Sequence, residues 1–227
     1  MTIFLLSPAR CDGRRTKALL SHKASFPLAV QLREPDGAPI GEVFAFLSGL
    51  YFRGKLTYAR AFASATEQIR VITTNSGLLT PDERVGPDDI AAFASVDLST
   101  AGEAFLGPLT RDAEALARDV PRDTKAVLLG SIATNKYVAP LMKVFGEQLV
   151  FPREFIGRGD MSRGGLLLRQ ANSSEQLEYI PVANAVRHGK RPPKLEPLAK
   201  NVRALGRWGV APTLQRYCFG FVRPSAR

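Results

Sequence analysis

Short apolar runs recur along the chain, and longer stretches with the spacing of amphipathic helices separate them. Runs of about four or five apolar residues bounded by turn residues are typical of strands buried in a sheet. The predicted strands are Thr2–Leu6 and residues 69–73, 126–129 and 148–151. The predicted helices are residues 26–33, 40–50, 52–65, 87–93, 100–120, 198–208 and Asn135–Phe145, with a break near Gly107 and a kink at Pro140. Strands that alternate with helices indicate an α/β fold.

Two apolar segments near the C-terminal end, residues 166–170 and 176–182, are separated by turn residues and predict a β-hairpin. Beyond this hairpin the chain is basic and interrupted by prolines. The sequence therefore predicts an α/β domain over residues 1–183, with a mixed β-sheet flanked by helices and the hairpin included. A basic C-terminal extension over residues 184–227 is predicted to pack on that domain.

The positive charge of the chain is concentrated in its last third. The formal net charge is +10, of which +1 falls in residues 1–150 and +9 in residues 151–227. A basic surface on a nearly neutral domain is typical of proteins that bind nucleic acid through its phosphates. A solvated basic tail without a partner is the alternative. The asymmetry favours binding to a polyanion, with DNA as the expected partner.

Other features of the composition exclude several classes of protein. The two cysteines, Cys11 and Cys218, do not make a disulfide framework, so a reduced cytoplasmic location is expected. The N-terminus lacks the basic start of a signal peptide, and no apolar run is long enough for a membrane helix. The two histidines, His22 and His188, stand apart from any Cys/His cluster, so no zinc site is expected, and no other metal or cofactor.

The segment of residues 155–169, FIGRGDMSRGGLLLR, combines glycines with charged side chains. Glycine lets the backbone turn tightly and approach a ligand, and arginine offers planar donors that match phosphate oxygens. Arg158, Ser162 and Arg163 are therefore predicted to bind a phosphate-bearing ligand, and Asp160 is the candidate general base. The alternative is a loop whose charges are solvated, with Asp160 as a cap or a partner of Arg158.

Two further clusters lie beside predicted secondary structure in the first third of the chain. Arg14 and Arg15 follow the first strand, at the edge of the sheet where α/β proteins bind ligands, and are predicted to contact phosphate. Cys11, in the same loop, is predicted to be a small buried residue rather than a nucleophile, because no histidine lies nearby in sequence to lower its pKa. Arg53 and Lys55 lie at a helix entry, where they either meet a ligand or form a solvated face.

Two more candidates are turns that follow predicted strands. Asn75 lies in the turn Asn75-Ser76-Gly77, where it either reads the edge of a base or only forms the turn, and the turn is favoured. Asn135 and Lys136 open a helix, whose N-terminus either binds an anion or is capped by Thr134 or Asn135. The chain has no Walker A loop, no GxGxxG after a strand, no GxSxG and no HxE…PCxxC deaminase pattern.

The order of these motifs resembles the YaaA family of peroxide-stress proteins and related YaaA-like domains. The shared pieces are Leu6-Ser7-Pro8-Ala9, Asn75-Ser76-Gly77-Leu78-Leu79, Thr134-Asn135-Lys136 and Arg158-Gly159-Asp160-Met161-Ser162-Arg163. The resemblance spans residues 3–170, and residues 51–63 also look like a helix of the wider YaaA-like group. It implies an α/β domain that binds DNA through a basic groove and acts in DNA damage or modified-base metabolism. It also implies a helix after residue 164, where the residues themselves predict a strand pair.

The resulting hypothesis is a monomeric DNA-binding protein that recognises a damaged or unusual base and cleaves its glycosidic bond. Asp160 would orient water or stabilise charge on the sugar, and Asn75 would contact the base edge. Phosphate contacts are assigned to Arg14, Arg15, Arg53, Lys55, Asn135, Lys136, Arg158, Ser162 and Arg163, and flanking contacts to Arg187, Lys190, Arg191 and Lys194. A DNA-binding module without chemistry, and an enzyme acting on a free nucleotide or nucleoside, are the alternatives.

Overall fold

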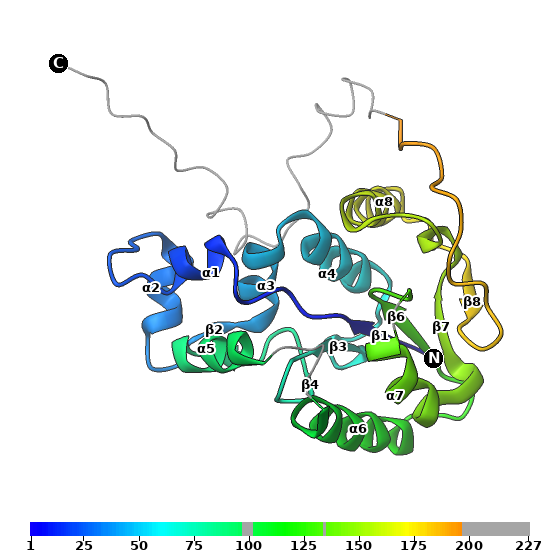
Figure 1. Ribbon diagram of the computed structural model, residues 1–227, viewed down its shortest axis with the longest axis horizontal. Helices are drawn as coiled ribbons and strands as arrows, with labels where there is room; N and C mark the ends of the chain where they lie inside the picture. Colours follow the sequence, from blue (N-terminus) through cyan, green and yellow to red (C-terminus); the bar gives the residue numbers. More distant parts are fainter. Residues whose placement is uncertain (97–101, 134, 197–227) are drawn as a thin grey trace.

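The computed structural model of the protein describes residues 1–96, 102–133 and 135–196 (Figure 1). The predicted helix at residues 198–208 and most of the predicted basic extension lie outside these residues. The described chain is an α/β fold built on a mixed sheet of six strands, in the order β4-β3-β1-β6-β7-β8. The prediction of a mixed sheet flanked by helices is confirmed.

Four parallel strands form the centre of the sheet, and an antiparallel strand lies at each edge. The parallel strands are β1 (Thr2–Leu6), β3 (Ile69–Ile72), β6 (Lys125–Leu129) and β7 (Leu149–Pro152). The edge strands are β4 (Leu78–Leu79) and β8 (Tyr179–Pro181), and a separate antiparallel pair is made by β2 (Ala38–Pro39) and β5 (Arg84–Val85). All four predicted strands are confirmed as the parallel centre of the sheet.

Helices cover both faces of the sheet, so the central strands are buried on both sides. Figure 1 shows α4 (Leu50–Phe62) and α8 (Asp160–Ser173) on one side, and α6 (Gly102–Asp119) and α7 (Asn135–Phe145) on the other. The remaining helices are α1 (Arg14–Leu19), α2 (Pro27–Arg33), α3 (Ile40–Ser48) and α5 (Pro87–Ser95), with short 3-10 turns η1 (Thr66–Gln68), η2 (Gly146–Gln148) and η3 (Arg153–Phe155). Burial on both faces explains why β1 is a continuous apolar run rather than an alternating one.

The order of the strands creates a point where the chain connections diverge. β1 lies between β3 and β6, so the chain leaves β1 toward one side of the sheet and later returns to its other side. The segments that follow β1 and β6 therefore part at the carboxyl ends of these two strands. Open α/β sheets bind ligands in the crevice at such a switch point.

Two glycines let α4 and α8 approach each other closely. A Cβ atom on Gly54 would lie 2.6 Å from the carbonyl oxygen of Gly164, and a Cβ atom on Gly164 would lie 2.8 Å from the carbonyl oxygen of Leu50. Neither position accepts a larger residue without a shift of backbone. The contact brings the first turn of α4 beside the first turn of α8, and both turns carry candidate site residues.

The predicted β-hairpin over residues 166–182 is wrong in its first half. Residues 166–170 lie inside α8, and residues 179–181 form β8, which pairs with β7 instead. Leu166, Leu167 and Leu168 are buried side chains of the helix. A short apolar run of this kind does not distinguish a strand from a buried helix. Residue 164 is therefore followed by a helix and not by a strand pair.

Two smaller corrections concern helices. The segment of residues 155–169, for which a loop was the alternative interpretation, contains only a short turn, because α8 begins at Asp160. The break expected near Gly107 is absent from α6, which runs through Pro108 as one helix. Pro108 removes one backbone donor but does not end the helix, whose buried face includes Phe105, Leu109 and Ala113.

Candidate active site

A cavity of about 260 Å³ opens at the switch point, and we call it the switch-point pocket. Three of its residues follow strands: Ser7 and Pro8 come after β1, and Ser131 comes after β6. The others come from four helices, α3, α4, α7 and α8, and from the loop after β1. The complete lining is Ser7, Pro8, Arg10, Ser48, Tyr51, Ser131, Lys136, Tyr137 and Asp160. Polar and charged groups therefore dominate a site that the topology of the sheet predicts.

Lys55 lies directly behind the pocket and is almost completely buried, with 1% of its surface exposed. Its Nζ donates to the backbone oxygen of Ser7 at 2.5 Å and contacts the Ser7 Oγ at 2.9 Å. The rings of Tyr51 and Phe52 lie 4.5 and 4.8 Å from the same nitrogen. Burial lowers the pKa of Lys55 to about 7 because it disfavours the ammonium form. To a smaller extent, the Asp160 carboxylate raises this pKa and the Arg163 guanidinium lowers it further.

Asp160 is the first residue of α8 and brings a carboxylate to the pocket. A negative charge in the first turn of a helix is favourable, because the unpaired N–H groups there carry partial positive charge. The Arg163 guanidinium, whose side chain is only 8% exposed, lies 3.7 Å from the Asp160 carboxylate. Arg163 also donates from Nε and Nη2 to the carbonyl oxygen of Phe155, at 3.3 and 3.0 Å. The buried arginine is thus fixed by the turn before α8, and Asp160 remains open to a ligand.

Tyr51 presents a hydroxyl group that has no hydrogen bond of acceptable geometry to any described residue. The side chain lines the pocket, yet Tyr51 as a whole is 7% exposed. Burial raises the pKa of this phenol to about 12, although the nearby Arg163 acts in the opposite direction. The hydroxyl therefore stays protonated near neutral pH and is an available donor for a ligand. A buried polar atom without a partner is costly, which marks the position as a candidate ligand contact.

The first turn of α7 forms the opposite wall of the pocket. Lys136 and Tyr137 line the cavity there, and burial raises the pKa of Tyr137. Arg187, from the segment after β8, donates to the Asn135 side chain at 3.0 Å and contacts the Ile132 oxygen at 3.5 Å. The contact ties the basic segment after β8 to the helix that carries Lys136.

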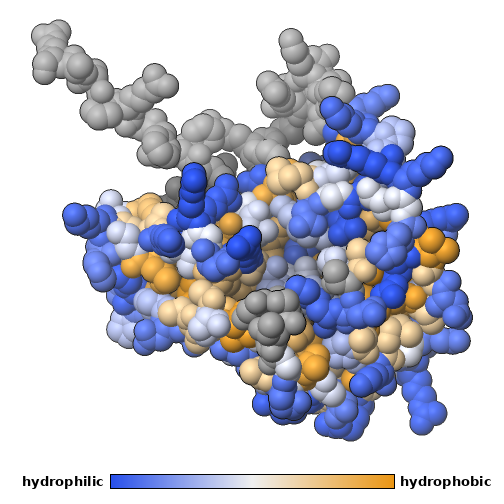
Figure 2. All heavy atoms as spheres, viewed as in Figure 1, coloured by the Kyte–Doolittle hydropathy of each residue, from blue (hydrophilic) through white to orange (hydrophobic). Residues whose placement is uncertain are grey.

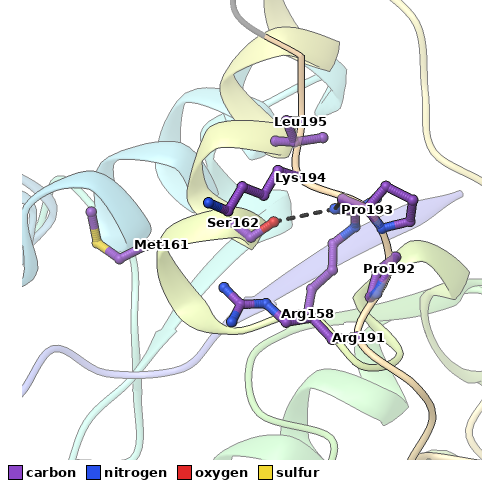
Figure 3. A pocket seen from close by; sticks show the side chains of 8 residues that line it. All are labelled: Arg158, Met161, Ser162, Arg191, Pro192, Pro193, Lys194 and Leu195. Atoms are coloured by element: carbon purple, nitrogen blue, oxygen red, sulfur yellow. Dashed lines mark hydrogen bonds between the residues drawn. The ribbon is translucent and has the colours of Figure 1, made fainter.

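A second cavity, also of about 260 Å³, lies on the other side of the first turn of α8 (Figure 3). We call it the basic groove, and it is lined by Arg158, Met161, Ser162, Arg191, Pro192, Pro193, Lys194 and Leu195. Arg158 crosses it, with Nη1 3.2 Å from the Ser162 Oγ and 3.4 Å from the Pro193 oxygen. Figure 2 shows hydrophilic side chains gathered where α8 and the segment after β8 meet. Asp160 faces one cavity while Met161 and Ser162 face the other.

The predicted site residues separate into two groups in the structure. Lys55, Lys136, Asp160 and Arg163 meet at or directly behind the switch-point pocket, and Arg158, Ser162, Arg191 and Lys194 meet in the basic groove. Asn135 and Arg187 pair at the edge of the pocket, and Lys190 is exposed in the segment between them and the groove.

Four predicted contacts lie elsewhere in the described structure. Asn75 is in the turn between β3 and β4, where its side-chain oxygen accepts from the Ser76 hydroxyl at 3.0 Å. Arg14 and Arg15 belong to α1, and Arg15 donates to the Phe46 oxygen at 3.0 Å. Arg53 is exposed on α4. None of the four lines either cavity.

Cys11 is buried, in agreement with its predicted structural role. Its sulfur lies 3.5 Å from the Ala9 oxygen, and burial raises the pKa of the thiol to about 12. A thiol with so high a pKa is a poor nucleophile near neutral pH.

Sequence reasoning did not single out Ser7, Tyr51 or Tyr137 as site residues. Ser7 directly follows the first buried strand, and this position could have identified it as a site residue. Tyr51 and Lys55 lie four residues apart, which places both on one face of α4.

Neither the remaining structural features nor known proteins identify a ligand for the site. Among the described residues, no group of three or more histidine, cysteine, aspartate or glutamate side chains could hold a metal ion. No helix within the same residues has the length and apolar character needed to cross a membrane. Searches against protein-family models, curated proteins and solved structures found no match. The resemblance to YaaA-like domains therefore stays a prediction.

Proposed function

We propose that the protein is a nucleic-acid-binding enzyme that holds one nucleotide unit in the switch-point pocket and cleaves its N-glycosidic bond. DNA with a damaged or unusual base is the proposed substrate, and the bacterial cytoplasm is the proposed location. The main observation behind the proposal is that residues at the start of α8 line two neighbouring cavities, some facing one and some the other. Asp160 supplies a carboxylate to the pocket, and the neighbouring Arg158 and Ser162 supply donors to the basic groove. The order of motifs shared with YaaA-like domains supports the same assignment.

The charges around the two cavities suit a phosphate backbone. Arg158, Arg191 and Lys194 line the groove, and Arg10 and Lys136 line the pocket. Contacts of this kind provide most of the affinity for nucleic acid without reading its sequence. In the proposed complex, the phosphates on one side of the target nucleotide lie in the groove, and the target nucleoside itself enters the pocket.

The chemistry proposed for the pocket matches the transition state of glycosidic cleavage. Breaking the bond between base and sugar develops positive charge on the sugar, which a carboxylate stabilises. Asp160 has this role in the proposal, and it also orients the attacking water. The free hydroxyl of Tyr51 donates a hydrogen bond to the departing base. A nucleotide must leave the base stack to reach such a pocket, and a damaged base leaves most easily.

Release of bases from defined oligonucleotides tests the proposal. Duplex and single-stranded oligonucleotides with different modified bases are incubated with the protein, treated with alkali and separated on a gel. Cleavage at one lesion is expected, and Asp160→Asn should reduce it by about 100-fold or more. The matched control is Asp82→Asn, an exposed carboxylate that pairs with Arg60 and lines neither cavity. Binding without cleavage across the panel would refute the enzymatic part of the proposal.

A further inference from the structure

The packing of the fold does not explain why the buried Lys55 side chain contacts Ser7. A buried lysine is expensive unless its ammonium is paired with a carboxylate, and such residues are rare in protein cores. The Lys55 Nζ contacts the Ser7 backbone oxygen, the Ser7 hydroxyl and two aromatic rings, and Asp160 and Arg163 act on it electrostatically. It forms no ion pair with a carboxylate of the described residues. Ser7, on its other side, lines the switch-point pocket.

We propose that Ser7 is an activated nucleophile, that Lys55 is its general base, and that this dyad hydrolyses a phosphate diester bound in the switch-point pocket. The proposal goes beyond glycosidic cleavage, because it assigns a second reactive centre and a different bond. It depends on Ser7 and Lys55, whereas the proposed glycosidic chemistry depends on Asp160.

The geometry has the features expected of an activated hydroxyl. Nucleophile and base lie within hydrogen-bond reach, at 2.9 Å, and a third group orients the base. That third group is the Ser7 backbone oxygen, which accepts a hydrogen bond from Nζ at 2.5 Å. Ser7 lines the cavity and Lys55 lies directly behind it, within reach of a proton transfer. Gly130 keeps space for this side chain, since a Cβ atom there would lie 2.8 Å from the Ser7 Cβ.

The charges facing Lys55 leave part of the amine neutral near pH 7. Burial is the main cause, Arg163 of α8 adds to it, and Asp160 of the same helix opposes it. Tyr51, on α4, contributes its ring and a protonated hydroxyl, and Lys136 adds a positive charge across the pocket. A neutral amine of this kind accepts the proton of the serine hydroxyl when the oxygen attacks.

The reaction balances with water as the only co-reactant. The Ser7 oxygen attacks phosphorus, the new O–P bond forms, and the Ser7 proton passes to the Lys55 amine. The bond from phosphorus to the leaving alcohol breaks, and the alkoxide takes that proton from Lys55. Water then attacks phosphorus, its proton passes to Lys55 and on to the departing Ser7 oxygen, and the phosphate monoester is released.

A phosphate ester suits the pocket better than a neutral ester. Arg10 and Lys136 line it, and the first turns of α7 and α8 border it. Positive groups and helix N-termini favour an anionic ligand. The buried Tyr51 hydroxyl lies near Arg163 but makes no hydrogen bond of acceptable geometry to a described residue. It is the second observation that points to a ligand, and it would donate to a phosphate oxygen.

Covalent labelling tests the dyad without knowledge of the natural substrate. The full chain is treated with diisopropyl fluorophosphate, from which the serine oxygen displaces fluoride, and the product is measured by intact-protein mass spectrometry. We expect one adduct per chain, and peptide sequencing should place it on Ser7. Ser7→Ala should abolish the adduct, and Lys55→Met should slow its formation by about 100-fold or more. Ser95→Ala, at an exposed position on α5 that lines neither cavity, is the matched control and should keep it.

Absence of an adduct in the unaltered protein, or an adduct on a different residue, would overturn the proposal. This result does not depend on the folding of any variant.

The substrate class is tested with bis(4-nitrophenyl) phosphate and 4-nitrophenyl acetate. Faster release of nitrophenolate from the phosphate, lost in Ser7→Ala and retained in Asp82→Asn, is expected. Faster release from the acetate would overturn the assignment of a phosphate ester. Failure of base release with retained labelling would reject the glycosidic proposal alone.

Discussion

Replacing the buried Lys55 by methionine should change the way stability depends on pH. Burial lowers the pKa of Lys55 from its ordinary value of 10.5 to about 7. Each pKa unit corresponds to about 1.4 kcal/mol, so the folded protein carries a cost of about 5 kcal/mol whenever the lysine is charged in both states. Methionine fills a similar volume and carries no charge. The Lys55→Met variant lacks the two contacts with Ser7, which lowers its free energy of unfolding by about 1–3 kcal/mol at every pH.

The sign of the effect follows from proton binding. Between about pH 7 and pH 10.5 the unfolded chain holds a proton on Lys55 and the folded chain does not. The free energy of unfolding of the unaltered protein should therefore rise by about 1.4 kcal/mol per pH unit relative to Lys55→Met. At pH 6 the variant should be more stable by about 2 kcal/mol or more, and this advantage should shrink and then reverse as the pH approaches 10.

Urea unfolding at pH 6, 7, 8 and 9 measures this difference directly, because the other titrating groups are common to both proteins. Lys143→Met, at an exposed position on α7, is the matched control, and its effect should be the same at every pH. A difference between the unaltered protein and Lys55→Met that stays constant from pH 6 to 9 would refute the account of Lys55 as a buried amine.

Two predictions test the packing that builds the site. Gly164→Ala should destabilise the protein by about 1–3 kcal/mol, because the new methyl group would lie 2.8 Å from the Leu50 oxygen. Gly165→Ala is its control, since that methyl group would make only an ordinary contact at 3.5 Å, and equal losses for both would contradict the close approach of α4 and α8. Tyr58→Phe should cost about 1–3 kcal/mol in thermal or urea unfolding, because it removes the acceptor at 2.9 Å from the Leu177 backbone N–H. An unchanged midpoint would show that water replaces this hydroxyl.

The four central strands of the sheet were predictable from the sequence because they are buried between two layers of helices. Continuous apolar runs such as Thr2–Leu6 are what a parallel strand between two layers of helices requires. The N-terminal half of α8 was not predictable in the same way. Gly164 and Gly165 suggested a turn, and only the close packing against α4 explains why Gly164 lies within a helix.

The candidate site was predictable in some of its charged residues but not in its chemistry, and Arg10, which lines the pocket, was not predicted. Lys136 was predicted from its position at a helix start and Asp160 from its Gly- and Arg-rich segment, and both line the pocket. The Ser7–Lys55 pair joins residues far apart in the chain, and its character depends on the complete burial of a lysine. Neither the contact nor the burial is visible from residue types alone, since a helical lysine is ordinarily exposed.

The salt dependence of binding to a single-stranded oligonucleotide tests whether the pocket and the groove hold one strand of nucleic acid. Each phosphate contact should contribute about 0.7 to the slope of log affinity against log salt concentration. Lys136→Ala in the pocket and Arg158→Ala in the groove should each reduce the slope by about that amount. Lys143→Ala, further along the helix that carries Lys136, should leave it unchanged. Slopes unaffected by both Lys136→Ala and Arg158→Ala, or binding that does not depend on salt, would contradict the account.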